Sequence, residues 1–197
     1  MPTGREQVLD AVETIIATRG LDGVSIREVA AAAGVSIGMV QYYCRSKDEM
    51  LVMAFEAVAE RIQRRVEADD RSGTVGDQMF RGLLELLPID ELRTREARIC
   101  LAFTARSLAS PTLAAVRYRL VTGLRGQCAE AYRGALALGE TLTDEDPETL
   151  AEMTAAYIDG LLMHMLTDPP ALSHDEGIAA LARHLASYVR ISVTVAA

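Results

Sequence analysis

The feature that most constrains this chain is the spacing of its apolar residues, which recur at intervals of three and four along most of the sequence. This spacing places them on one side of an α-helix. We find no segment that reads credibly as a strand, and glycine and proline separate the helical segments. The sequence therefore predicts an all-α chain of about nine helices.

Three short helices are predicted at the N-terminus, before a fourth over residues 46–69. The first spans residues 5–18. Ser25 and Glu28 form the S-x-x-E pattern of a capping box at the start of the second, which must stop near Gly34. The third begins after Ser36 and ends near residue 44. Helices this short are stable only when they pack on one another, so a small three-helix domain is expected.

Longer helices are predicted after the polar stretch DDRSGT, over residues 75–87, 90–108, 111–138, 147–166 and 174–193. Ser110 and Asp146 each precede a proline, and Ser173 with Glu176 repeats the capping box. We therefore predict two domains, residues 1–48 and residues 49–197, linked through the helix that starts near Lys47.

The charge of the chain is unevenly distributed. The net charge of -8 disfavours indiscriminate binding to phosphate polymers. Residues 1–65 contain 8 Lys/Arg and 9 Asp/Glu, whereas residues 66–197 contain 12 and 19. The N-terminal third is thus nearly neutral, which permits a nucleic-acid site there.

Several other classes of protein are disfavoured. No apolar run approaches the roughly 20 residues of a membrane span, and no signal-peptide core is present, so a cytoplasmic location is expected. The three cysteines are widely spaced and form no CxxC pair, so we interpret them as small buried residues. The chain has no glycine-rich phosphate loop, histidine–carboxylate metal motif or nucleophile elbow. An enzyme, a metal site and a cofactor are therefore not expected.

Residues 34–50, GVSIGMVQYYCRSKDEM, predict DNA binding. Two short helices joined by a turn at Gly34 form a helix-turn-helix, whose second helix enters the major groove. Gln41 can pair with an adenine edge, and Ile37 and Met39 can pack on thymine methyls. The residues expected to face outward are Ile37, Gly38, Met39, Gln41 and Tyr42.

Lys47, the only lysine of the chain, and Tyr43 flank the start of the fourth helix. Its N-terminal amides and its dipole favour an anion. We call this group the phosphate clamp. Ser25 and Arg27, at the start of the second helix, are candidates for a second one, and Ser36 at the start of the third completes the predicted DNA-binding set.

Residues 5–60 resemble the DNA-binding domain of the TetR family of bacterial transcriptional regulators. The matching stretch is VLDAVETIIATRGLDGVSIREVAAAAGVSIGMVQYYCRSKDEML. It contains the family's Gly-Val-Ser (Gly34, Val35, Ser36), Tyr43 and Lys47, with apolar Val40 and Met50. Two positions depart: Gln41 replaces a frequent aromatic residue, and Cys44 replaces a core phenylalanine.

This resemblance implies a homodimeric, ligand-responsive regulator that binds double-stranded DNA, of the repressor type, released from a palindromic operator by a small-molecule inducer. It also implies that the C-terminal helices bind the effector and form the dimer. Two alternatives stay open: a transcriptional activator, and a helical ligand- or partner-binding protein that has lost DNA binding.

The candidate ligand pocket combines apolar and polar residues of the long helices. Core packing is the competing interpretation for each apolar residue, a solvated helix end for Arg106, and a core or interface position for His164. The candidates are Phe80, Leu84, Phe103, Arg106, Tyr118, Met153, Tyr157 and His164.

The last two helices are apolar over more than one face, so one face of each is expected to meet a second copy in a four-helix bundle. A two-fold dimer presents two reading helices about 34–36 Å apart, which suits a palindromic operator. The predicted interface residues are Tyr157, Leu161, Met165, Leu181, Leu185 and Tyr188.

Overall fold

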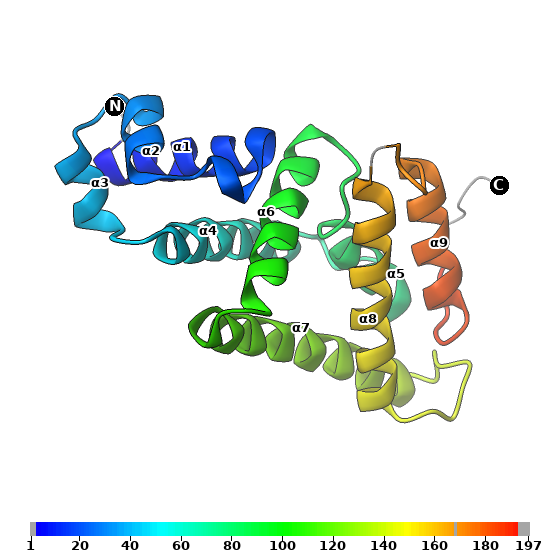
Figure 1. Ribbon diagram of the computed structural model, residues 1–197. Helices are drawn as coiled ribbons and strands as arrows, with labels where there is room; N and C mark the ends of the chain where they lie inside the picture. Colours follow the sequence, from blue (N-terminus) through cyan, green and yellow to red (C-terminus); the bar gives the residue numbers. More distant parts are fainter. Residues whose placement is uncertain (1–2, 168, 193–197) are drawn as a thin grey trace. The chain divides into compact units, whose positions relative to one another are not determined.

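The computed structural model describes residues 3–167 and 169–192, and most of them lie in helices (Figure 1). The prediction of an all-α chain is confirmed, since this part contains no strand and only one isolated β-bridge, between Thr141 and Val189. The helices are α1 (Gly4–Arg19), the 3-10 helix η1 (Leu21–Gly23), α2 (Ile26–Ala33), α3 (Ile37–Tyr43), α4 (Lys47–Glu67), α5 (Val75–Leu84), α6 (Glu91–Ser107), α7 (Pro111–Ala137), α8 (Pro147–Leu166) and α9 (His174–Ala186).

The end of α9 differs from the sequence prediction, which continued that helix to residue 193. The helix ends at Ala186; the N–H groups of residues 187–189 still bond to carbonyls of its last turn, but the backbone at residues 188 and 190 also bonds to a distant segment. The Leu142 N–H donates to the Tyr188 carbonyl at 2.8 Å, and the Arg190 N–H donates to the Glu140 carbonyl at 2.8 Å. Residues 140 and 142 thus bond to the segment that follows α9. Val193 lies outside the described residues.

The segment after α9 also binds the start of α5. The Thr74 hydroxyl donates to the Arg190 carbonyl at 2.8 Å, and the Ser192 N–H and hydroxyl donate to the Asp77 carboxylate. Burial alone would raise the pKa of Asp77, but the hydrogen bonds from Ser192 and Thr74 outweigh it and hold the pKa far below its usual range. We call this contact the C-terminal clasp.

The chain divides into two compact units. The first comprises residues 1–61 and 95–117, so α6 packs with the N-terminal helices. The second comprises residues 62–94 and 118–197. The long helix α4 contributes residues to both, because the division falls within it.

An ionic cluster in the first unit joins α1, α4 and α6. Arg61 Nη2 donates to Glu13 Oε1 and Arg61 Nε to Glu96 Oε1, both at 2.9 Å. The two glutamates are only 6% and 2% exposed. Burial raises the pKa of Glu13, although Arg61 and Arg95 oppose the rise. One guanidinium therefore stabilises two buried carboxylates from different helices.

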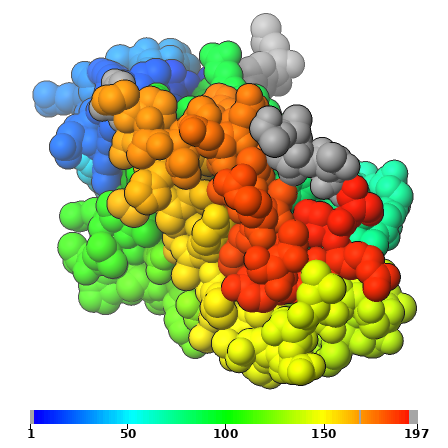
Figure 2. All heavy atoms as spheres, turned by 90° about the vertical axis from the view of Figure 1, so that its right-hand side faces the viewer, coloured from blue at the N-terminus to red at the C-terminus, as the bar shows by residue number. Residues whose placement is uncertain are grey.

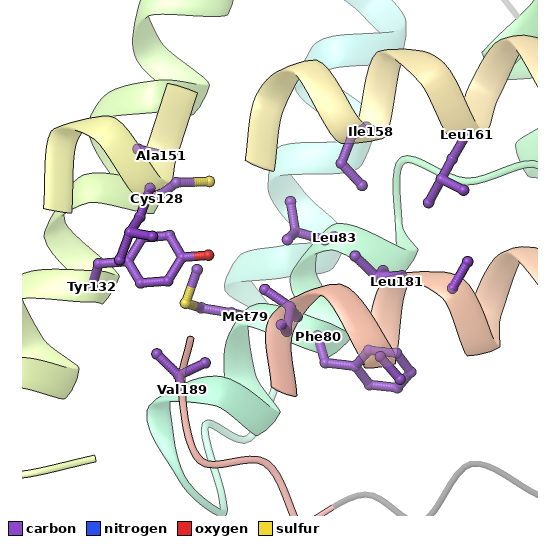
Figure 3. Packing of buried hydrophobic residues seen from close by; sticks show 14 of the residues in the cluster. Met79, Phe80, Leu83, Cys128, Tyr132, Ala151, Ile158, Leu161, Leu181 and Val189 are labelled. Atoms are coloured by element: carbon purple, nitrogen blue, oxygen red, sulfur yellow. The ribbon is translucent and has the colours of Figure 1, made fainter. Parts of the chain in front are cut away.

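The core of the second unit collects apolar residues of α5, α7, α8 and α9 (Figure 3). A short polar chain runs through it: the Tyr132 hydroxyl lies 2.8 Å from the Thr154 hydroxyl, which lies 3.0 Å from His184 Nε2. The His184 ring stacks on that of Tyr157, with centroids 4.2 Å apart. Burial lowers the pKa of His184, which favours the neutral imidazole.

Candidate nucleic-acid interface and effector-binding residues

Two serine caps and one glycine set the geometry of the predicted helix-turn-helix. The Ser25 hydroxyl accepts the Glu28 N–H at 3.2 Å, and the Ser36 hydroxyl accepts the Met39 N–H at 3.2 Å. Between them Gly34 ends α2 with φ 66° and ψ 31°, the left-handed region that glycine adopts without strain. The turn between α2 and α3 therefore forms as the sequence predicted.

The two faces of α3 differ sharply in exposure. Val40 and the following Cys44 are buried, at 0% and 1%, and anchor the helix to the small domain. On the opposite face Ile37, Met39 and Tyr42 are 47%, 41% and 80% exposed. Gln41 and Gly38 are exposed too, and among the described residues the nearest side-chain atom to a Cβ built on Gly38 is the Ser36 hydroxyl oxygen, at 3.9 Å. All five predicted groove-facing residues lie on this open face.

The surroundings of the phosphate clamp are less uniformly positive than the sequence suggests. Lys47 Nζ lies 3.8 Å from a carboxylate oxygen of the fully exposed Asp22, which is a loose pair. The first turn of α4 also carries Asp48 and Glu49; Asp48 accepts from Arg106 at 3.0 Å. Glu49 accepts the Arg45 N–H at 2.8 Å, and its own N–H donates to the Ser46 hydroxyl at 3.1 Å, so one amide of the first turn of α4 already has an acceptor.

The start of α1 is a neighbour of this site that was not predicted from the sequence. Thr3 and Glu6 form a complete capping box there. A Cβ on Gly4 would lie 2.8 Å from Met39 Sδ and 3.6 Å from the Tyr43 hydroxyl, so the first turn of α1 approaches the reading face. The T-x-x-E spacing could have revealed the cap, but nothing in the sequence indicates the approach to α3.

Two of the three cysteines, Cys44 and Cys128, are buried as predicted, whereas Cys100 is partly exposed. Burial raises the pKa of both Cys44 and Cys128 to about 11, so their thiols stay protonated and poorly nucleophilic at neutral pH. The smaller Cys44 replaces the family's phenylalanine without leaving the core, and its Sγ lies 3.7 Å from Met53 Sδ.

The predicted pocket residues have separate surroundings. Phe80 and Phe103 are buried, and Phe103 stacks on Phe55 with ring centroids 3.9 Å apart. Arg106 is paired with Asp48, Tyr157 stacks on His184, and Tyr118 is 74% exposed. Met153 and His164 are exposed on α8. Of the eight, Leu84 lines an open pocket of about 400 Å³ in the second unit.

Four of the six predicted interface residues are packed inside their own chain. Leu161, Met165, Leu181 and Leu185 are at most 6% exposed and belong to the core of the second unit. They cannot also cover a partner, because the helix faces that carry them point inward. Tyr157 and Tyr188 are partly buried on either side of His184. The exposed residues of α8 are the apolar Met153, Ala156 and Met163 and the polar Glu148, Thr149, Glu152, Asp159 and His164.

No helix in the described part of the chain is long and apolar enough to cross a membrane. Among residues 3–167 and 169–192, no group of three or more His, Cys, Asp or Glu side chains could hold a metal ion.

Comparison with known proteins decides the family. The model of the tetR family of bacterial regulatory proteins matches residues 8–54, which contain α2, the turn and α3. The model of the C-terminal domain of BetI-type transcriptional repressors matches residues 77–190. The chain belongs to the TetR family. It is thus a ligand-responsive, DNA-binding transcriptional regulator, in a family of regulators rather than enzymes.

Individual TetR-family relatives are similar over nearly the whole chain. The HTH-type transcriptional regulator PksA of Bacillus subtilis is 29% identical over 185 residues, covering 93% of this chain and 88% of PksA. A transcriptional regulator from Rhodococcus sp. is 33% identical with a TM-score of 0.83, covering 93% of this chain and 95% of that structure. A regulator from Saccharomonospora viridis in complex with choline has a TM-score of 0.85 at 24% identity, covering 95% and 98%, and shows the fold alone.

Proposed function

We propose that this TetR-family protein is a homodimeric repressor, which acts in the cytoplasm on a palindromic operator and is released from it by a small-molecule inducer. The observation that carries the proposal is the outer face of α3. Ile37, Met39 and Tyr42 keep between 41% and 80% of their surface exposed on a seven-residue helix. Contiguous exposed apolar residues mark a binding surface, and the major groove offers thymine methyls to such residues.

The residues around this face have distinct proposed roles. Gln41 reads a base edge, because its amide carries both a donor and an acceptor. Tyr43 and Lys47 bind phosphate and fix the orientation of α3, as do Ser25 and Arg27 at the start of α2 and Ser36 at the start of α3. Few positive charges are needed when helix N-termini supply part of the attraction.

The proposed dimer uses the outer faces of α8 and α9, which lie side by side on the surface seen in Figure 2. Met153, Ala156, Gly160 and Met163 follow one another at the spacing of a single helical face. Met153 and Met163 are 43% and 59% exposed, so two large apolar side chains are uncovered on this face in one chain, with the exposed Glu152 and His164 at its edges. We therefore propose these residues, with Tyr157 and Tyr188, in place of the four buried ones.

Induction follows from reciprocal coupling. We propose that the inducer prefers a dimer in which the spacing of the two reading helices does not match successive major grooves. Such an inducer lowers the affinity for the operator, and the operator lowers the affinity for the inducer by the same factor. The continuous helix α4 begins at the phosphate clamp and ends in the second unit, so it is the element through which we propose that the two sites communicate.

The test is fluorescence anisotropy of the purified protein on DNA from upstream of its own gene, at several salt concentrations. Lys47→Ala should weaken binding to all sequences and reduce the salt slope by about 1. Gln41→Ala should relax selectivity at one base pair and weaken the free energy of binding to the operator by about 1–3 kcal/mol. Tyr42→Ala should weaken binding, whereas Tyr118→Ala, which alters a similarly exposed tyrosine of α7, should not.

Equal binding of operator and random DNA, unchanged by these substitutions, would instead support a protein that has lost DNA reading. A reporter gene behind the operator separates repression from activation, because deletion of the regulator raises expression only if it represses. Sedimentation tests the dimer: Met163→Glu should yield monomers, and Leu108→Glu, at an 84% exposed position outside the proposed interface, should not.

A further inference from the structure

A carboxylate lies in the first turn of α4, directly after Lys47 of the phosphate clamp. Asp48 is the second residue of this helix. The clamp offers a phosphate the Lys47 ammonium and two helix amides, because the N–H groups of Lys47 and Asp48 have no acceptor among the described residues. Acidic side chains in the first turn of a helix are attracted to the same amides. A free Asp48 carboxylate would therefore compete with phosphate at the clamp.

Two donors from outside α4 hold this carboxylate. Arg106 Nε donates to Asp48 Oδ1 at 3.0 Å, and the Ser110 hydroxyl donates to Asp48 Oδ2 at 3.1 Å. Arg106 lies in the last turn of α6, and Ser110 directly precedes α7. All three residues belong to the first compact unit, although Arg106 and Ser110 follow Asp48 by 58 and 62 residues. Both oxygens of Asp48 are thus bound to the turn between α6 and α7.

The pair of Asp48 and Arg106 contributes little to folding. Its side chains are 30% and 46% exposed, and ion pairs at such exposure are weak because water screens them. Arg61, in contrast, binds Glu13 and Glu96, which are only 6% and 2% exposed. Stability therefore does not account for the contact at Asp48, whereas its place beside the clamp does.

We propose that Arg106 and Ser110 are positioning residues for DNA binding, and that they act through Asp48. They hold its carboxylate at the turn between α6 and α7, so that a phosphate meets Lys47 and the two free amides without a competing anion. Among the described residues Lys47 pairs only with Asp22, loosely, at 3.8 Å, and not with the adjacent Asp48. The proposal rests on the phosphate-binding role of Lys47 in the proposed function. It gives Arg106 a role in DNA binding in place of the effector contact considered from the sequence.

The experiment is a double-mutant cycle, measured by fluorescence anisotropy on DNA from upstream of the protein's own gene. Arg106→Gln should weaken operator binding about threefold to tenfold, the effect of one unit charge released close to a phosphate at a protein surface. Asp48→Asn should bind at least as tightly as the wild type. Addition of Arg106→Gln to Asp48→Asn should then weaken binding less than about twofold, because no carboxylate remains to be held. Ser110→Ala should weaken binding less than Arg106→Gln, because it removes a neutral donor.

A control variant and a folding measurement accompany the cycle. Arg133→Gln, which breaks an exposed pair with Glu148 in the second unit, should leave operator affinity unchanged. Thermal unfolding establishes that each variant is folded. Arg106→Gln should shift Tm by less than about 4 °C, as expected for the loss of one exposed ion pair.

Two results would overturn the positioning role and leave the proposed function standing. The first is a folded Arg106→Gln protein that binds the operator as the wild type does. The second is an equal loss of affinity on Arg106→Gln in the wild-type and Asp48→Asn backgrounds, because Arg106 would then act on DNA without Asp48. Failure of the proposed function is a different result: the wild-type protein would not distinguish the operator from random DNA, or Lys47→Ala would leave binding unchanged. Either of these overturns both proposals.

Discussion

Replacement of Arg61 by methionine should destabilise the first unit strongly, because it removes the guanidinium from between Glu13 and Glu96. Methionine retains much of the length and apolar contact of the arginine side chain. What it loses is two charge-assisted hydrogen bonds of 2.9 Å to carboxylates that are 6% and 2% exposed.

The expected magnitude follows from the surroundings of the cluster. A hydrogen bond to a charged group contributes about 1.5–3 kcal/mol, and breaking a buried ion pair costs about 3–5 kcal/mol. Two features reduce the loss: the Arg61 side chain is 28% exposed, and Arg95 remains 3.5 Å from Glu13. We therefore expect a loss of about 3 kcal/mol in the free energy of unfolding at pH 7, about 6–12 °C in Tm.

The dependence on pH identifies the cause. Burial already raises the pKa of Glu13, and removal of Arg61 raises it further. In the folded variant Glu13 then keeps a proton that the unfolded chain has released. The deficit in the free energy of unfolding is therefore largest above the pKa of Glu13 in the folded variant. It shrinks as the pH falls toward about 4, where both states are protonated. Urea unfolding at several pH values measures this, and Arg133→Met, at an exposed ion pair, is the matched control.

Two results would refute the reasoning. A deficit of the same size at pH 4.5 and pH 7.5 would mean that lost packing, and not buried charge, destabilises the variant. A deficit no larger than that of Arg133→Met, about 0.5 kcal/mol, would mean that the cluster is as weak as a surface pair. Addition of Glu13→Gln to the Arg61→Met protein should recover part of the loss, because it removes one of the stranded charges.

Three further outcomes are expected. Gly34→Ala should destabilise the protein by about 1 kcal/mol and weaken operator binding, measured by thermal unfolding and anisotropy, because Gly34 has φ 66°. Asp77→Asn should lower the free energy of unfolding by about 2 kcal/mol at pH 7, measured by urea unfolding. Because the folded pKa of Asp77 is lowered, its contribution to stability is present above the unfolded pKa and is lost on acidification. The stability of the variant should therefore depend less on pH below about pH 4. His184→Gln should flatten the loss of stability on acidification below about pH 6.5, because burial lowers the folded pKa of His184 and only the unfolded chain takes up the proton there.

Local signals made the N-terminal site predictable from the sequence. The caps at Ser25 and Ser36 and the glycine turn act within four residues of themselves, so spacing alone reveals them. The end of α9 could not be predicted, because Tyr188, Val189 and Ile191 continue the apolar pattern, whereas the backbone of residues 188 and 190 bonds to residues 142 and 140. The burial of several predicted interface residues could not be predicted for a related reason: Leu181 and Leu185 are as apolar as an interface requires, and only the packing shows that their own chain covers them.

The choice of arginine over lysine follows from the ionic clusters. Every basic residue except Lys47 is arginine, in a chain with 28 Asp/Glu against 20 Lys/Arg. The planar fork of a guanidinium lets one cation serve two carboxylates, as Arg61 does for Glu13 and Glu96, which are 48 and 35 residues away in sequence. A lysine is a point charge and cannot match both directions. Arg61→Lys keeps the charge but should still be destabilised by about 1.5 kcal/mol, half of the deficit of Arg61→Met. Full stability of Arg61→Lys in urea unfolding would show that charge alone, and not the shape of the guanidinium, selects arginine here.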